Sequence, residues 1–406
     1  MSESPIHISP YPSAKDFAVT FVDDTDYATV QNTQPVYEFV HHLGFAGTKT
    51  VWPLAQQRSS AFRRELERPI FDGEAGGSSL EDSQYLSYVL GLKDKGFEIA
   101  LHGVAGGNSY RAEILSGLDR FRTLFGQDPN INVFHARNID NLYCGAHKLD
   151  IALFRILERL LHRSDYQGHI KDSPYFWGDF LRSRIKYVRL PFHTIPFPNT
   201  LKFNPTMPFH DPRRPFVSYW FASSDGSDCA RFVKLLREEN GLRLKRERGA
   251  CIVYTHFAKG FLEKTPHGWS LNPAFAVTME RLADFKTVWC PTASELLDRL
   301  LATRHLSIDQ QGYEVKISNR SDADLTDVTF YVPSGVTWRD EIGTRYHAGD
   351  SGIITVPMIP ARRAVHFTSS VKQNFLAPRK SPFGLPRWER SRIEIINYYG
   401  QIRDYL

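Results

Sequence analysis

Short apolar runs alternate with helix-like segments over roughly the first 300 residues of this 406-residue chain. The runs are rich in β-branched and aromatic residues, which is typical of buried strands, and the segments between them carry apolar residues at helical spacing. The expected strands are 17–22, 45–52, 97–101, 131–134, 187–190, 216–221, 251–255 and 287–290. This alternation predicts an α/β fold with a parallel sheet, and a (β/α) barrel is the closed form of that pattern.

Several of the expected helices have recognisable ends. Pro35 is expected in the first turn of one helix, and Gly44 is expected to stop it. Thr292 and Glu295 form a capping box that predicts a helix over 293–301. The other expected helices are 82–95, one that carries Ile114 to Phe125, and 148–162.

The pattern changes near Leu306, where strand-like segments follow one another without helices between them. Residues 313–317, 328–332, 353–356 and 364–367 alternate apolar and polar side chains, which favours a small antiparallel β-sandwich. We therefore expect a barrel domain over 1–304, a small β-sandwich over 305–370, and a tail over 371–406 with a terminal helix.

Composition and charge narrow the range of partners. The net charge of +5 is small for this length and does not indicate nucleic-acid binding, which needs clustered basic residues. The N-terminus has no basic, apolar pattern of a secretory signal, and no apolar run reaches the roughly 20 residues that span a bilayer. A cytoplasmic protein is expected. The basic tail invites peripheral contact with an anionic membrane, although a solvated linker explains it equally well; its residues are Arg379, Lys380, Arg387, Arg390 and Arg392.

Two adjacent carboxylates, Asp23 and Asp24, end the first expected strand. A fold tolerates two close like charges only when a cation, a shared proton or solvent relieves them. In α/β folds, ligands bind at the C-terminal ends of parallel strands, so this pair is a candidate site. The alternative is a solvated turn with a helix N-cap, for which Thr25 and Asp26 are suited.

Further polar residues follow the other expected strands. One histidine after a strand is more often structural, but a closed barrel would bring several strand ends together. Imidazole and carboxylate are the ligands of zinc and similar divalent ions. The residues in such positions are Asp23, Asp24, His102, His135, Arg137, His193, Asp225 and His256.

At these residues the chain resembles the polysaccharide deacetylase superfamily, the NodB-like carbohydrate esterases, over roughly 15–302. The matching segments are Val19-Thr-Phe-Val-Asp-Asp24, Phe97-Glu-Ile-Ala-Leu-His102, Phe134-His-Ala-Arg137 and Ile252-Val-Tyr-Thr-His256. The resemblance implies a NodB-like distorted barrel and a divalent metal, with zinc as the expected ion. It implies Asp23 as general base, Asp24 and His102 as metal ligands, Arg137 as the brace of the base, and His256 as general acid.

The chain departs from the family pattern at two places. The second metal histidine of the family is replaced by Gly106, so Asn108, His135 or His193 is expected to substitute, unless the metal is weak or absent. The arginine motif continues as Asn138-Ile-Asp-Asn141 in place of the usual Pro-Pro-Tyr.

The leading hypothesis is a metal-assisted hydrolase that removes an acyl group from an N-acetylated sugar or sugar conjugate. Trp52 and Tyr143 are candidate aromatic faces for a sugar, and the residues expected to bind substrate are His135, Asn138, His193, Trp220 and Asp225. One alternative is a metal-free glycoside hydrolase on the same barrel, with Asp225 or Asp172 as the second acid. The other is a carbohydrate-binding pseudoenzyme in glycan synthesis, which the broken second motif favours.

Overall fold

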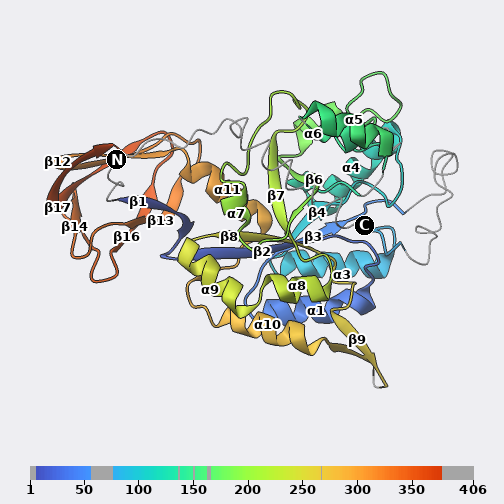
Figure 1. Ribbon diagram of the computed structural model, residues 1–406, viewed down its shortest axis with the longest axis horizontal. Coiled ribbons are helices and arrows are strands. Elements are labelled where there is room, and N and C mark those ends of the chain that lie inside the picture. Colours follow the sequence, from blue (N-terminus) through green and yellow to red (C-terminus); the bar gives the residue numbers. More distant parts are fainter. Residues whose placement is uncertain are drawn as a thin grey trace.

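The computed structural model describes residues 6–55, 76–135, 138–149, 151–161, 166–266 and 268–376. Figure 1 shows a barrel wrapped by helices, with a separate group of β-strands at one end of the long axis. The expected tail over 377–406, with its terminal helix and basic residues, lies outside the described residues.

A closed parallel barrel forms the larger part of the molecule. Its strands in the described chain are β2 (Phe17–Asp23), β3 (Thr48–Val51), β4 (Glu98–Leu101), β5 (Ile131–Asn132), β6 (Tyr187–Ile195), β7 (Tyr219–Asp225) and β8 (Ala250–Thr255). Neighbouring strands pair in this order, and β2 pairs with β8 from Ala18 and Ala250 to Asp23 and Thr255, which closes the ring. The predicted α/β barrel is confirmed as a seven-stranded ring, consistent with a NodB-like barrel. The eighth expected strand, β11 (Val288–Trp289), pairs beside β2 outside this ring.

Helices cover the outside of the barrel (Figure 1). The longer ones are α1 (Val30–His42), α3 (Ser83–Asp94), α4 (Arg111–Phe125), α5 (Ala152–Leu161), α9 (Glu238–Glu247), α10 (Pro273–Ala283) and α11 (Ala293–Thr303). Shorter ones are α6 (Gly178–Arg184), α7 (Thr200–Phe203), α8 (Cys229–Leu235) and the 3₁₀ turn η2 (Gly145–Lys148). The capping box of Thr292 and Glu295 is present. Helix α1 starts earlier than expected because Thr29 caps it, so Pro35 lies inside the helix rather than in its first turn.

The strands pack apolar side chains on both faces. On β2, Phe17, Val19 and Phe21 join the outer core under the helices, while Ala18 and Val22 join the core inside the barrel. Successive side chains of a strand point to opposite faces, so residues two apart share a face. This alternation continues past the strand ends and decides which polar side chains enter the barrel mouth.

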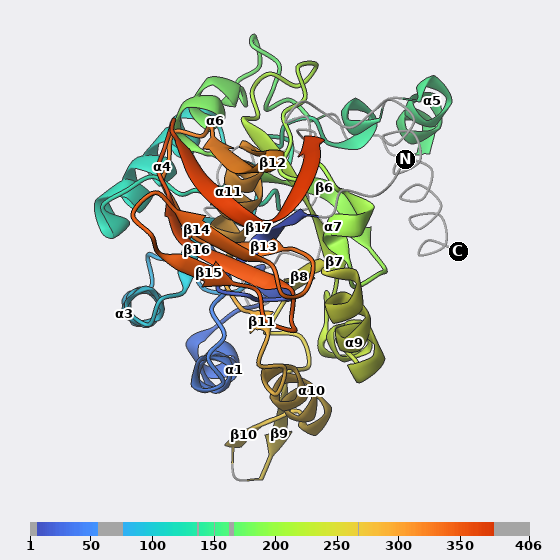
Figure 2. The ribbon, with the colours of Figure 1, turned by 90° about the vertical axis from the view of Figure 1, so that its left-hand side faces the viewer.

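Two antiparallel sheets form the smaller part (Figure 2). One contains β1 (His7–Pro12), β13 (Leu325–Tyr331) and β16 (Ile353–Ile359). The other contains β12 (Leu306–Asn319), β17 (Ala364–Leu376), β14 (Thr337–Asp340) and β15 (Arg345–His347). Phe330, Trp338 and Ile308 are buried between them. The N-terminal strand β1 was not expected in this part of the fold, and the domain limits at 304 and 370 stay a prediction.

A short hairpin, β9 (Leu262–Thr265) and β10 (Gly268–Leu271), projects from the barrel near α10 (Figure 1). None of the helices in the described ranges combines the length and the apolar character needed to cross a membrane.

Candidate functional site

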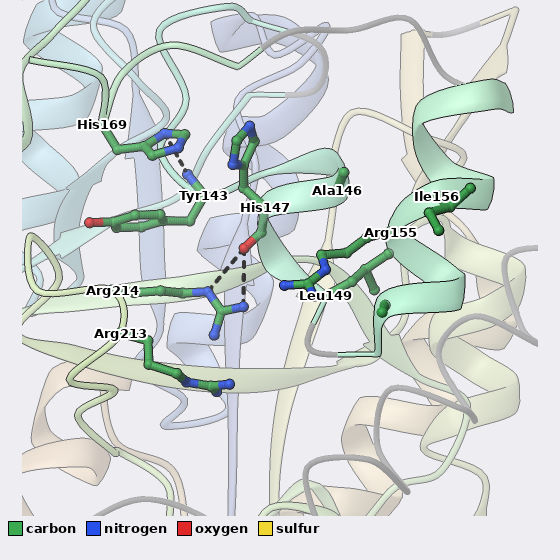
Figure 3. Close-up of a pocket in the computed structure, with 10 residues that line it drawn as sticks. Tyr143, Ala146, His147, Leu149, Arg155, Ile156, His169, Arg213 and Arg214 are labelled. Carbon is green, nitrogen blue, oxygen red and sulfur yellow. Dashed lines mark hydrogen bonds between the residues drawn. The ribbon is translucent and has the colours of Figure 1, made fainter.

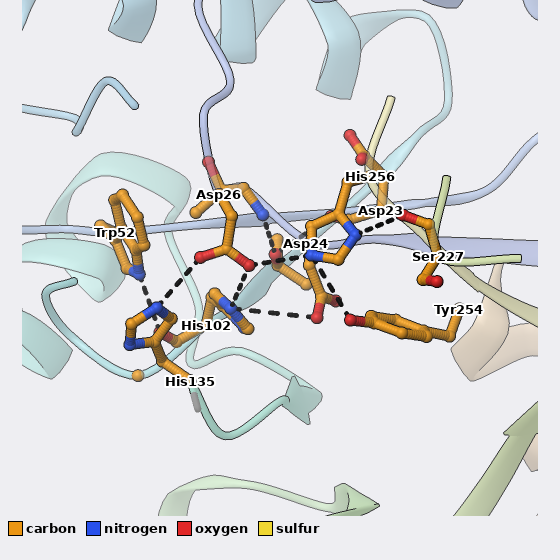
Figure 4. Close-up of polar contacts among 12 residues, drawn as sticks. Asp23, Asp24, Asp26, Trp52, His102, His135, Ser227, Tyr254 and His256 are labelled. Atoms are coloured by element: carbon orange, nitrogen blue, oxygen red, sulfur yellow. Dashed lines mark hydrogen bonds and ion pairs between the residues drawn. The ribbon is translucent and has the colours of Figure 1, made fainter. Parts of the chain in front are cut away.

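Polar side chains from four barrel strands converge at the C-terminal end of the barrel (Figure 4). Asp24 and Asp26 follow β2, and single histidines follow β4, β5 and β8. The histidines share the face of inward-pointing residues earlier in their strands: His102 follows Ala100, His135 follows Ile131 and Val133, and His256 follows Ala250 and Ile252. The alternation of the strands therefore directs these rings into the barrel mouth.

Asp26 is the centre of this cluster. Its Oδ1 lies 3.0 Å from Nε2 of His135, and its Oδ2 lies 2.9 Å from Nε2 of His256 and 3.4 Å from Nε2 of His102. Burial alone would raise the pKa of Asp26, but the charges of His102 and His135, together with the hydrogen bond of His135, hold it well below its ordinary value. The carboxylate is thus ionised and faces three imidazoles.

Asp24 is held by an arginine from the barrel wall. Arg189, on β6, donates from Nη1 to Oδ1 of Asp24 at 2.8 Å and from Nη2 to Oδ2 at 2.5 Å, which is a bidentate pair. The guanidinium also lies 4.5 Å from the ring centroid of Tyr254. Burial opposes ionisation of Asp24, yet Arg189 and the neighbouring histidines keep its pKa below the ordinary value. Asp24 is therefore an ionised, rigidly oriented carboxylate.

Asp23 faces the opposite way, under α1. Its Oδ1 accepts the backbone N–H of Phe257 at 2.7 Å, and its Oδ2 accepts from Nζ of Lys49 at 2.7 Å and from the hydroxyl of Tyr37 at 2.9 Å. Asp23 and Lys49 are both fully buried. The side chain shares the outward parity of Phe21, so it is a structural anchor outside the cluster and does not fit the role of general base.

The hydrogen bonds of two histidines fix which ring nitrogen faces the cluster. The Nδ1 of His135 pairs with Oδ1 of Asn138 at 3.0 Å, and the amide of Asn138 donates to the carbonyl of Gly107, which orients that oxygen toward the ring. The Nδ1 of His256 lies 2.7 Å from the carbonyl of Ser227. Since a carbonyl only accepts, Nδ1 of His256 carries a proton there, and Nε2 is the ring nitrogen that faces Asp26.

The cluster fits a divalent metal ion. One oxygen of Asp26 and one ring nitrogen each of His102 and His135 lie within 4.8 Å of one another. Both ring nitrogens of His102 are buried without a hydrogen bond in the described chain, which is costly unless another partner is present. Two imidazoles and one carboxylate match the donor set of zinc and related ions. The second possible group, Asp24, Asp26 and His256, is less suited because the guanidinium of Arg189 places a positive charge directly beside Asp24, which opposes the binding of a metal cation there.

Other residues expected at the site lie elsewhere or outside the described atoms. Arg137 is outside the described residues, and His193 lies within β6, with its side chain outside them. Trp220 is buried near the start of β7, away from the strand ends. Asp225 ends β7 and lies 3.8 Å from Arg231, and Asp172 is exposed in a loop. Asn138 reaches the cluster only through His135.

Sequence reasoning missed Asp26, Arg189 and Lys49 as members of this region. The sequence suggests Asp26 only as a helix cap, but Thr29 caps α1 and Asp26 turns into the barrel mouth. The sequence does offer a sign of Arg189, because it is a charged residue inside an apolar strand. It lies two residues after the inward-facing Tyr187 and therefore on the same face of the strand. Lys49 is likewise a charged residue within a buried strand, on the outward face of β3.

A cavity of about 540 Å³ lies apart from the cluster (Figure 3). Its lining includes Tyr143, His147, His169 and Arg214, and it contains no member of the cluster. Arg214 donates to the carbonyls of His147 and Lys148, so its guanidinium supports the wall of the cavity. Tyr143, expected as an aromatic face for a sugar, lies in this cavity, whereas Trp52 stacks on His102 with centroids 6.1 Å apart.

No protein-family model matches the sequence, and no curated protein is significantly similar to it. Among solved structures, Puue allantoinase is 10% identical, with a TM-score of 0.40 over 74% of this chain and 95% of that one. A probable polysaccharide deacetylase from Pseudomonas aeruginosa is 11% identical, with a TM-score of 0.38 over 72% and 93%. A GH57-type branching enzyme from Pyrococcus horikoshii is 11% identical, with a TM-score of 0.35 over 70% of each chain. Likeness at this level does not assign an activity to this chain.

Proposed function

We propose that the cluster is the active site of a metal-assisted hydrolase that removes an acyl group from an N-acetylated sugar or sugar conjugate. The observation that carries the proposal is the convergence of Asp26, His102 and His135 beside a carboxylate fixed by arginine and a third histidine. These groups supply a metal site, a base and an acid within one barrel mouth. The resemblance of the strand-end motifs to the deacetylase superfamily favours the same reaction class.

Asp26, His102 and His135 would hold the metal ion. When bound, a divalent ion in such a site lowers the pKa of water and polarises the acyl carbonyl. Asn138 keeps the ring of His135 turned so that Nε2 points at Asp26. This assignment moves the metal ligand from Asp24, as the motif implied, to Asp26 two residues later.

Asp24 is reassigned as the general base in place of Asp23. Its carboxylate is ionised because of Arg189, and the bidentate pair fixes the direction of its lone pairs. Asp24 takes a proton from the attacking water as the new C–O bond forms. Arg189 thereby fills the bracing role that the resemblance gave to Arg137.

His256 is the candidate general acid. Its Nδ1 donates to the carbonyl of Ser227, so a proton on Nε2 can be given to the leaving amine as the C–N bond breaks. In the structure Nε2 points into the cluster, 2.9 Å from Asp26. The base and the acid thus approach the cluster from β2 and β8, which are adjacent strands of the barrel.

Acetate release from a panel of N-acetylated sugars and oligosaccharides, measured with added zinc, tests this function. Wild-type protein should release acetate from at least one member, and Asp24→Asn should lower the rate by roughly 10²-fold or more, the contribution of one acid–base group. Glu280→Gln, the same chemical change at an exposed position on α10, should leave the rate unchanged. Acetate release by Asp24→Asn at the wild-type rate would contradict the assignment of the base.

A further inference from the structure

The cluster opens to solvent on the side of Asp26. The side chain of Asp26 is 16% exposed, whereas those of His102, His135 and Asp24 are 2% or 3% exposed. A ligand therefore reaches the cluster past Asp26 and the residues next to it. Two side chains that contact each other lie near this residue: Tyr27 follows Asp26 directly in the chain, and Lys259 interacts electrostatically with Asp26.

The backbone holds Tyr27 in an unusual conformation. Its φ of 63° is in the left-handed region, which a bulky aromatic residue rarely adopts. The turn is tied on both sides, because the N–H of Tyr27 donates to the carbonyl of Gly76 and its own carbonyl accepts from Nδ2 of Asn32. Such an outlier, kept by its surroundings beside a reactive cluster, points to a role for the side chain that it positions.

Lys259 is tied to the same cluster through the backbone of His256. Its backbone N–H donates to the carbonyl of His256 at 2.9 Å, which places it in the turn after β8. Its Nζ lies 5.0 Å from the centroid of the Tyr27 ring, within the range of a cation–π interaction. The ammonium and the ring therefore form one partly exposed surface next to Asp26.

The charges around the cluster leave this ammonium without an acidic partner. Asp23 is paired with Lys49, Asp24 is paired with Arg189, and Asp26 contacts imidazoles. Among the residues that the structure describes, no carboxylate oxygen lies within 4.0 Å of Nζ of Lys259. Partial burial lowers the pKa of Lys259. The negative charges of Asp26 and Asp24, which do not contact its ammonium directly, act in the opposite direction. A negatively charged group on a ligand would relieve this desolvated cation.

We propose that Lys259 is a specificity residue that binds an anionic group of the substrate while the ring of Tyr27 packs on the sugar. The substrate is then an acylated sugar that also carries a carboxylate or a phosphate. This inference rests on the proposed function for its substrate class, but the contact itself involves only Tyr27, Lys259 and the sugar, and it does not require the metal.

Binding of three probes tests the proposal: glucose, glucuronic acid and glucose 6-phosphate, measured by ligand-observed NMR on chelator-treated and on zinc-loaded protein. At least one anionic sugar should bind wild-type protein roughly tenfold more tightly than glucose, the effect of one charge-assisted hydrogen bond. The preference should disappear in Lys259→Met and remain in Lys259→Arg. Lys264→Met, which removes the same charge from the exposed hairpin strand β9, should keep it.

The outcomes separate this proposal from the proposed function. A preference that depends on Lys259 in chelator-treated protein supports the role of Lys259 even if no acetate release is ever found. An equal preference in Lys259→Met and wild type overturns it, as does wild-type protein that binds glucose as tightly as both anionic sugars. The two anionic probes also tell a carboxylate substrate from a phosphate substrate.

Discussion

At the scale of single residues, three aspartates within four positions have three different environments. Asp23 is enclosed by Lys49 and Tyr37 under α1, whereas Asp24 is clamped by Arg189 in the barrel mouth. Asp26 faces His102, His135 and His256. The division follows from strand parity for the first two, because adjacent residues point to opposite faces. Asp23 therefore anchors the fold, whereas the next residue, Asp24, belongs to the proposed active site.

The buried pair of Asp23 and Lys49 should be important for stability. Lys49→Met leaves a buried carboxylate without its cation and should lower the free energy of unfolding by about 3–5 kcal/mol. Lys186→Met breaks a pair of equal length, 2.7 Å from Asp298, but on the surface, and should cost less than about 1 kcal/mol. Urea denaturation of both variants measures the difference, and equal losses would contradict the anchor role of Asp23.

The double variant Asp23→Asn/Lys49→Met separates charge from packing. It removes both buried charges and keeps the shape of the Asp23 side chain, so it should recover part of the stability that Lys49→Met loses. A double variant that is less stable than the single one would show that the amide cannot replace the carboxylate toward Tyr37 and Phe257.

Asp140 should make stability depend on pH. Burial raises its pKa to about 7, although the N–H of Ser109 donates to it. The unfolded chain loses this proton near pH 4 and the folded chain near pH 7, so between these values the folded state binds more protons. The contribution of Asp140 to stability is therefore present at low pH and lost as pH rises through about 7.

The variant Asp140→Asn tests this dependence. Wild-type protein should lose up to a few kcal/mol relative to the variant between about pH 4.5 and pH 7.5, measured from the free energy of unfolding. Parallel pH curves for the two proteins would contradict the raised pKa.

At the scale of elements, the barrel strands were predictable and the loops after them were not. The strand-like runs before His102 and His256 correspond to β4 and β8, and parity directs both histidines inward. Strand β6, however, continues to Ile195, so His193 lies within it and not after it. Asp26 was missed because the chain turns directly after it, at Tyr27 with a positive φ, and the alternation of apolar and polar residues does not predict such a turn.

The loop after β5 should tune the metal site through Asn138. This side chain links His135 to the carbonyl of Gly107, which lies in the loop after β4. Asn138→Ala frees the ring and should weaken zinc binding by roughly 10–100-fold without preventing folding, as for other partners of metal-ligating histidines. Zinc affinity measured by chelator competition checks this, and an unchanged affinity would show that the ring is held by other contacts.

At the scale of the whole molecule, the first and the last strand of the described chain, β1 and β17, both belong to the antiparallel sheets beyond the barrel. Strand β1 pairs with β13, and Arg299 of α11 donates to the carbonyls of Thr326 and Asp327. The sequence predicted the all-β character after Leu306 from alternating residues. It could not predict that β1 joins these sheets, because pairing across more than 300 residues leaves no local pattern.

A chain that ends at residue 304 should keep the site and lose solubility. Every proposed ligand lies between residues 24 and 256, so one zinc ion per chain should remain. The truncation leaves β1 without β13, and an unpaired strand edge promotes aggregation. Solubility and metal content are the measurements. Soluble, folded protein without zinc would show that the β-sheets complete the site.

Asp26, rather than the motif residue Asp24, is proposed to join His102 and His135 in holding a divalent ion. Zinc titration of chelator-treated protein, with metal content measured by mass spectrometry, tests it most directly in wild type, Asp24→Asn and Asp26→Asn. We expect close to one zinc ion per chain in wild type and in Asp24→Asn, and a loss of at least about 10-fold in affinity for Asp26→Asn. Zinc that stays bound in Asp26→Asn and is lost in Asp24→Asn would contradict it.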